Sequence, residues 1–249
     1  MLRKASVIKC FFLFILAFGL QQIVTAFSYI SPSYEWLQYI IFLMVICISI
    51  LIIKAEGASF REYGFLMPEG VSRYFWASLF LAVFYVFVII FLPGSVAGLE
   101  AFPPVSISLN LFLMTVSILL SSIAAETIFR GYIQTSLTNA YGFSKALIIS
   151  SIMFTLYMLL MPFYVGVTST TLFYNAISLF AESVFLCFLF KKTKTLLCPI
   201  IYSASVTLLY TFTPLKPISS EYAIVFLVIP YIFFVPLVYF LRVERVGTV

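Results

Sequence analysis

The stretch Ala125–Gln134 reads Ala-Glu-Thr-Ile-Phe-Arg-Gly-Tyr-Ile-Gln and lies inside an apolar run, 109–137. Residues at positions i and i+4 share one face of a helix, so Glu126 and Arg130 are predicted to meet. A charged side chain near the centre of a bilayer costs ~2.5–3.5 kcal/mol on insertion scales, so such residues usually have a partner or a role. Two interpretations stay open: a salt bridge that anchors helix packing, and a functional site.

The composition is that of a membrane protein. Hydrophobic residues make up 63% of the 249 residues and charged residues 9%, whereas a soluble domain has ~25% charged residues. The chain has no His, and all 9 of its acidic residues are Glu. It therefore lacks the usual general base and the commonest metal ligand. The basic residues lie at predicted helix ends rather than in one patch, which argues against a nucleic-acid partner.

Apolar runs of roughly 20 residues, the length that crosses a bilayer, fill the chain and leave no room for a separate soluble domain. The pattern predicts one all-α membrane domain over residues 1–249, a polytopic bundle of about eight transmembrane helices. The predicted spans are 7–30, 35–54, 74–93, 108–138, 144–165, 170–190, 196–213 and 222–241. Turn residues separate them, among them Pro93-Gly94 and Tyr141-Gly142.

The first apolar segment has two features of a signal peptide. Basic residues precede it, and Val24-Thr25-Ala26 loosely resembles a cleavage site. The apolar run continues past that point to Ile30, so we expect a membrane span. We expect an integral, multi-pass protein of a prokaryotic plasma membrane, with the lipid bilayer as its surroundings.

The longest connection on the basic side of the membrane, 55–72, alternates aromatic and charged residues. This pattern is compatible with a short amphipathic element along the membrane interface. It is equally compatible with an ordinary loop anchored by its aromatic residues.

A third charged residue, Glu182, lies in the sixth predicted span, at a depth that permits contact with the fourth. One Arg against two Glu leaves a surplus carboxylate, which is either protonated or exposed to a water-filled cavity. Glu182 is therefore a candidate cavity carboxylate. The alternative is a partner for Arg130 or Lys191.

Three motifs in order resemble the CAAX-protease and bacteriocin-processing family of intramembrane endopeptidases, which includes the type II CAAX prenyl endopeptidases. The family's Glu-Glu-x-x-x-Arg, followed by Gly-Tyr and Gln, matches Ala125–Gln134. Its Ser-rich stretch ending in Phe-x-x-x-His matches Ser150–Met158, with Phe154 as the Phe. Its His-x-x-x-Asn after a Pro matches Pro199–Thr207. The resemblance covers about residues 108–210.

The departures from the family pattern fall on its chemical groups. Ala125 replaces the first Glu, Met158 and Ser203 replace the two His, and Thr207 replaces the Asn. The resemblance implies that Glu and His activate water, while His and Asn stabilise the oxyanion or hold a metal. Glu126 and Arg130 are then the remnant of a catalytic motif. Family members can use zinc, but without His we expect no metal and no cofactor.

The motifs therefore predict a catalytically degenerate member of the family. Such a pseudoprotease would bind or escort a membrane segment or a lipidated peptide, or serve as a subunit of a membrane complex. Two alternatives stay open. One is an active endopeptidase with a reduced site, in which Glu126 is the base and Ser203 or Thr207 an assisting donor. The other is a small transporter or ion pathway that uses Glu126, Arg130 and Glu182.

The basic residues also predict the topology. When the N-terminus, the even-numbered connections and the C-terminus are counted as one side, that side carries twelve basic residues and the other only Lys216. Since cytoplasmic loops carry the excess of Lys and Arg, both termini should be cytoplasmic. Cysteine labelling of intact cells should modify a Ser219→Cys variant and leave Gly247→Cys unmodified. Modification of position 247 from outside would refute this topology.

Overall fold

The computed structural model describes residues 2–30, 36–67, 70–97, 109–159, 169–212, 230–236 and 238, and no strand lies among them. The helices are α1 (Leu2–Ile30), α2 (Trp36–Ala55), α3 (Val71–Ala97), α4 (Leu109–Glu126), the π-helix η2 (Thr127–Gln134), α5 (Thr135–Tyr141), α6 (Phe143–Leu159), α7 (Ser169–Thr193) and α8 (Leu197–Phe212). Residues 230–236 are also helical. The all-α prediction is confirmed for this part of the chain.

The helices coincide with the predicted spans. Within the described ranges, four are long and apolar enough to cross a membrane: Val7–Val24, Trp36–Ala55, Leu111–Tyr141 and Leu172–Thr193. Three apolar helices are shorter, namely Ser72–Val88, Phe143–Leu159 and Leu197–Leu209. Of the eighth predicted span, 222–241, only 230–236 and 238 lie within the described residues.

The structure corrects one predicted break and confirms another. Helix α3 continues through Pro93 and Gly94 to Ala97, so the break predicted there is wrong. Pro is tolerated in helices within a membrane because neighbouring helices and local adjustments satisfy the freed backbone groups. By contrast, Gly142 does end α5, with a left-handed φ of 83° that suits a glycine after a helix.

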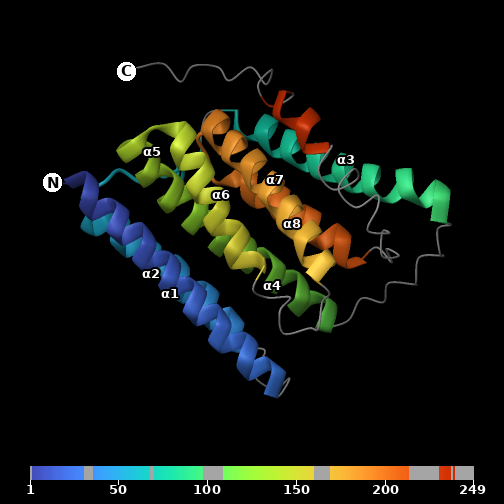
Figure 1. The fold of residues 1–249 in the computed structure, drawn as a ribbon, viewed down its shortest axis with the longest axis horizontal. Coiled ribbons are helices and arrows are strands. Elements are labelled where there is room, and N and C mark those ends of the chain that lie inside the picture. Colours follow the sequence, from blue (N-terminus) through green and yellow to red (C-terminus); the bar gives the residue numbers. More distant parts are fainter. Residues whose placement is uncertain are drawn as a thin grey trace.

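The helices are arranged side by side (Figure 1), with the α1/α2 pair along one edge and α3 along the other. Between these edges, α4 packs on α2 and α8, α6 packs on α5, η2 and α7, and α8 packs on α3. Buried apolar side chains form two clusters. The first joins α1, α2, η2 and α6, whereas the second joins α3, α7, α8 and the described residues 231–236 and 238.

Several connections meet at one end of the bundle, which we call the basic end. The Lys9 ammonium lies 3.0 Å from the Glu56 carboxylate, which brings α1 to the loop after α2. The Leu196 amide donates to the Gly64 carbonyl at 2.9 Å, which brings the same loop to the α7–α8 turn. These are segments that the alternation of spans predicts on one side of the membrane. That this side is cytoplasmic stays a prediction.

The loop after α2 is packed through its glycine. The described part of the connection, residues 56–67, forms turns rather than a helix, so the anchored loop is the better of the two interpretations of 55–72. Gly64 has a φ of 80°, and a Cβ there would lie 2.5 Å from Phe190 Cε2 and 3.1 Å from the Leu196 amide nitrogen. The loop therefore touches the α7–α8 turn at a point where only glycine fits.

Gly64→Ala should lower the free energy of unfolding more than Gly57→Ala does. Both residues have positive φ, but a Cβ at Gly57 meets nothing within 4 Å, so the control carries the backbone cost alone. Overpacking at Gly64 should add roughly 1–3 kcal/mol. Thermal unfolding of the purified protein in detergent measures the difference. Equal midpoints for the two variants would contradict this tight contact.

Candidate functional site

A π-helix lies in the C-terminal half of the fourth predicted span, directly after Glu126. η2 covers Thr127–Gln134, all eight of which are buried. The Thr135 hydroxyl donates to the carbonyl of Arg130, five residues earlier, at 3.3 Å. Short π-helical segments within α-helices are frequent at functional sites. Here the segment carries the Arg-Gly-Tyr-x-Gln part of the first motif.

Glu126 and Arg130 form an ion pair, as their i, i+4 spacing predicts. Arg130 Nε lies 3.3 Å from Glu126 Oε2, and both side chains are 0% exposed. Neither carboxylate oxygen, nor Nε, makes an aligned hydrogen bond within the described protein. The contact is therefore mainly one of charge.

Two further groups enclose the guanidinium. Arg130 Nη2 donates to Ser183 Oγ of α7 at 3.1 Å. The guanidinium carbon of Arg130 lies over the Phe154 ring of α6, 4.2 Å from the ring centroid, in the range of a cation–π contact. Phe154 is the Phe of the second motif, so two motifs meet at one arginine.

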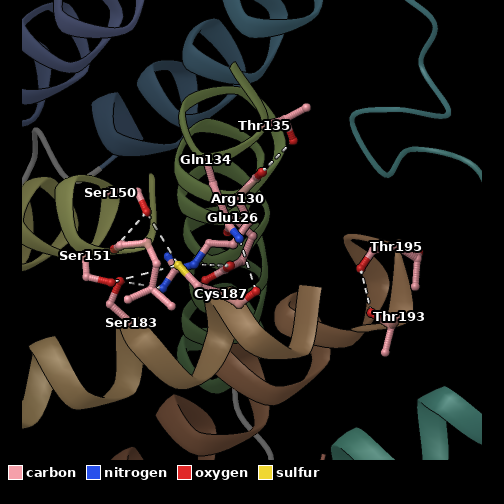
Figure 2. A network of polar contacts seen from close by, with 11 residues as sticks. Glu126, Arg130, Gln134, Thr135, Ser150, Ser151, Ser183, Cys187, Thr193 and Thr195 are labelled. Carbon is pink, nitrogen blue, oxygen red and sulfur yellow. Dashed lines mark hydrogen bonds and ion pairs between the residues drawn. The ribbon is translucent and has the colours of Figure 1, made fainter. Parts of the chain in front are cut away.

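The arginine belongs to a polar junction of three helices (Figure 2), which consists of Glu126, Arg130, Gln134, Ser150, Ser151, Ser183 and Cys187. Gln134 Nε2 donates to the Cys187 carbonyl at 3.1 Å. Cys187 Sγ lies 3.5 Å from Ser150 Oγ and 3.9 Å from Ser151 Oγ of α6.

The junction sets the register of α7. The contacts Arg130–Ser183 and Gln134–Cys187 each join residues that are 53 apart in the sequence. Because both partners advance by four residues together, η2 and α7 run in the same direction. That is the relation expected of two even-numbered spans.

Glu182 is half-buried and lies beside Ser183 on α7. It interacts electrostatically with Arg130 and Glu126, although the hydrogen-bonding partner that the structure gives Arg130 on α7 is Ser183. Lys191, the other partner considered, has its ammonium 3.7 Å from the Phe143 ring centroid. The surplus carboxylate is therefore close to the junction without being the direct third member of the ion pair.

The positions that align with the family's catalytic groups lie on α4, α6 and α8. Ala125 is buried before η2. Met158 is partly buried against the first apolar cluster. Ser203 lies on α8, the helix that contributes Tyr202 and Val206 to the second apolar cluster. Ser203 itself is 8% exposed. The exposed Thr207 donates its hydroxyl to the Ser203 carbonyl at 2.9 Å, which is an ordinary bond within one helix.

A second polar centre, which was not predicted from the sequence, surrounds Glu56 at the basic end. Glu56 Oε1 accepts hydrogen bonds from Lys9 Nζ at 3.0 Å and from the Tyr132 hydroxyl at 2.9 Å. Tyr63 donates to Oε2 at 3.4 Å, and its ring stacks on Tyr132 with centroids 5.9 Å apart. Burial raises the pKa of Tyr63, and the charge of Glu56 raises it further, so the phenol stays protonated and can donate.

The signal for this centre was the Tyr of the first motif. Tyr132 ties the motif to the loop after α2, and the neighbouring Gly131 permits the approach. A Cβ at Gly131 would lie 3.3 Å from Leu196 Cδ1 and 3.5 Å from the Tyr63 carbonyl. Such distances would be crowded, so glycine suits this position.

The residues present do not fit a zinc ion. Within the described ranges, no group of three or more His, Cys, Asp or Glu side chains could hold a metal. Zinc needs three or four such ligands. The Arg130 guanidinium beside Glu126 also repels a cation.

A comparison with protein families agrees with the three motifs. Residues 106–209 match the family described as Rce1-like, type II CAAX prenyl endopeptidase, and this segment runs from α4 into α8. None of the curated proteins compared with the chain matches it. The family match over residues 106–209 and the apolar helices together support an integral membrane protein.

Glu126→Gln should destabilise the protein strongly, because it leaves the buried guanidinium of Arg130 without its counter-charge. Removing one partner of a buried pair typically costs ~3–5 kcal/mol. Ser203→Ala is the control, since Ser203 is also buried in the bundle but carries no charge. Thermal unfolding in detergent should show a much larger loss for Glu126→Gln. Similar, small losses in both variants would mean that the pair is solvated.

Proposed function

We propose that this member of the CAAX-protease family is a multi-pass pseudoprotease, which binds or escorts a membrane segment or a lipidated peptide without cleaving it. The observation that carries the proposal is the state of Glu126. The carboxylate that would act as the base is fully buried and paired with Arg130, as described above. Glu126 and Arg130, the two residues of the catalytic motif that remain, hold the helices together, and this structural role accounts for their presence.

Proteolysis by activated water needs a base that reaches a water molecule. Glu126 has no exposed surface, and Arg130 occupies the space beside it at 3.3 Å. Phe154 covers the guanidinium on another side. A carboxylate held in this way is a poor candidate for proton abstraction, which supports the pseudoprotease over the endopeptidase with a reduced site.

The same reaction needs donors for the oxyanion and groups that orient the water. The chain offers Met158, Ser203 and Thr207 at the matching positions. The Thr207 hydroxyl is engaged with the Ser203 carbonyl of its own helix, and a thioether cannot replace an imidazole as a base. A nucleophilic role for Ser203 would also need an activating base, and the chain has no His or Asp to supply one.

The residues that the chain keeps are those with a packing role. Arg130, Gln134 and Phe154 join three helices, while Gly131 and Tyr132 join the same helices to the loop after α2. A framework preserved without its chemistry suits a protein that holds a ligand. The family points to a peptide-like or prenylated ligand, and that step rests on analogy.

The purified protein should not cleave prenylated CAAX peptides or transmembrane peptides, with or without added zinc. Loss of one oxyanion donor alone typically costs ~2.7–4 kcal/mol in the transition state, and here the imidazoles and one carboxylate are replaced as well. Mass spectrometry of the peptides after incubation measures this. Turnover that disappears in Glu126→Gln would overturn the proposal.

A binding measurement tests the other half of the proposal. A farnesylated peptide should bind the detergent-solubilised protein, and the same peptide without its farnesyl group should bind more weakly, because burial of each CH₂ contributes ~0.8 kcal/mol. Fluorescence anisotropy of labelled peptides measures both. A farnesylated peptide that binds no better than an empty-detergent control would count against a lipidated ligand.

A further inference from the structure

We propose that the inner faces of α4 and α7 open toward the end of the bundle opposite the basic end and hold there a membrane segment of another protein, one that carries a basic residue, with Glu182 as its counter-charge. This inference rests on the proposed function and narrows it to one class of ligand. It is carried by the exposure of side chains along two helices and by the balance of charge at the junction.

The face of α4 that carries Glu126 becomes exposed within two turns of the junction. Glu126 lies beside Arg130, which contacts α6 and α7, so this face is turned toward those helices. Ser122, Leu119 and Phe112 precede Glu126 by four, seven and fourteen residues and share its face. Ser122 is 4% exposed, whereas Leu119 and Phe112 are 40% and 63% exposed. The face is therefore covered at the junction and uncovered toward the start of α4.

Helix α7 shows the same change along the face that carries Glu182. Leu186 and Leu189, four and seven residues after Glu182, are 0% and 1% exposed and belong to the second apolar cluster. Ser178 and Asn175, four and seven residues before it, are half-buried, as is Glu182 itself. Since α4 runs on into η2, which is parallel to α7, both faces open toward the same end of the bundle.

The polar residues on this part of α7 indicate a ligand rather than lipid. Glu182, Ser178 and Asn175 lie within the span Leu172–Thr193, and ionisable side chains in a membrane span face the bundle interior or pair with a partner. Phe173, nine residues before Glu182, lies on the opposite side of the helix and is 60% exposed. Polar groups therefore line the inner side of the opening, and an aromatic ring lies on the outer side.

The balance of charge determines which segment fits. Arg130 and Glu126 compensate one another, which leaves Glu182 as a surplus carboxylate that interacts electrostatically with both of them. The ion pairs found in the described part of the chain do not involve Glu182. The exposed Leu119 suits an apolar segment, and a Lys or Arg within that segment would supply the missing positive charge. A lipidated peptide without such a charge would leave Glu182 unbalanced.

Binding of two model transmembrane peptides to the full chain in liposomes tests the proposal. The peptides share one apolar span and differ at a central position, which is Lys in the first and norleucine in the second. Energy transfer between labelled protein and labelled peptide measures both affinities. The wild-type protein should bind the Lys peptide roughly tenfold more tightly, the scale of a polar contact between membrane helices. Glu182→Gln should abolish this preference, whereas Glu62→Gln, which removes an exposed carboxylate from the loop after α2, should keep it.

A second pair of variants tests where the peptide binds. Leu119→Trp should crowd the opening on α4 and weaken the binding of both peptides roughly fivefold or more. The matched control Leu51→Trp, at a 62% exposed position on α2, should leave both affinities unchanged. Size-exclusion profiles verify that all variants fold. Equal effects of the two Trp variants would overturn the assignment of the ligand to this opening.

The remaining outcomes separate this inference from the proposed function. Equal affinity of the wild-type protein for the two peptides, or a Lys preference that survives Glu182→Gln, would overturn the inference and leave the binding of a membrane segment intact. Binding of a farnesylated peptide but of neither transmembrane peptide would overturn it in favour of a lipidated ligand. Binding of none of the three would overturn the proposed function together with this inference.

Discussion

The fold is organised by the cost of placing a guanidinium and a carboxylate inside an apolar bundle. Since lipid supplies no hydrophobic driving force between helices, packing there depends on close contact and on polar interactions between helices. The Glu126–Arg130 pair uses both. Its charges compensate one another within one helix, while Ser183 of α7 and Phe154 of α6 complete the surroundings of the guanidinium. Three helices are thereby held at one depth and in one register.

This arrangement shows what the first motif contributes to packing. Its Arg130, Tyr132 and Gln134 each contact another element, and a buried alanine stands at position 125, where the family pattern has a Glu. Ala125 fits beside the ion pair at 4% exposure, where a second carboxylate would need a second counter-charge or a proton. One Arg can balance one Glu, so the substitution relieves an excess of negative charge in the interior. The packing of these helices therefore does not require a carboxylate at position 125.

Much of the fold followed from elementary patterns. Apolar runs predicted the helices, and the i, i+4 spacing predicted the Glu126–Arg130 pair, because both depend on local geometry. Helix periodicity states which side chains share a face and not what lies opposite that face, so Ser183, Cys187 and the ring of Phe154 could not be identified as partners. The π-helix left no local signal that we recognised. Glu56 was missed for a similar reason, since its partners Lys9 and Tyr132 are 47 and 76 residues away.

The Glu56 centre has a consequence for how this protein can be divided. Glu56, Lys9 and Tyr63 all precede residues 106–209, the segment that matches the family. Nevertheless, Glu56 accepts a hydrogen bond from Tyr132 within that segment, Tyr63 stacks on Tyr132, and Lys9 holds Glu56 in place. α1 and α2 also cover one side of η2. An excised core would expose a phenol, an apolar cluster and the underside of the π-helix. The segment that matches the family thus depends on α1, α2 and the loop after α2 for the covering of η2 and for a partner to Tyr132.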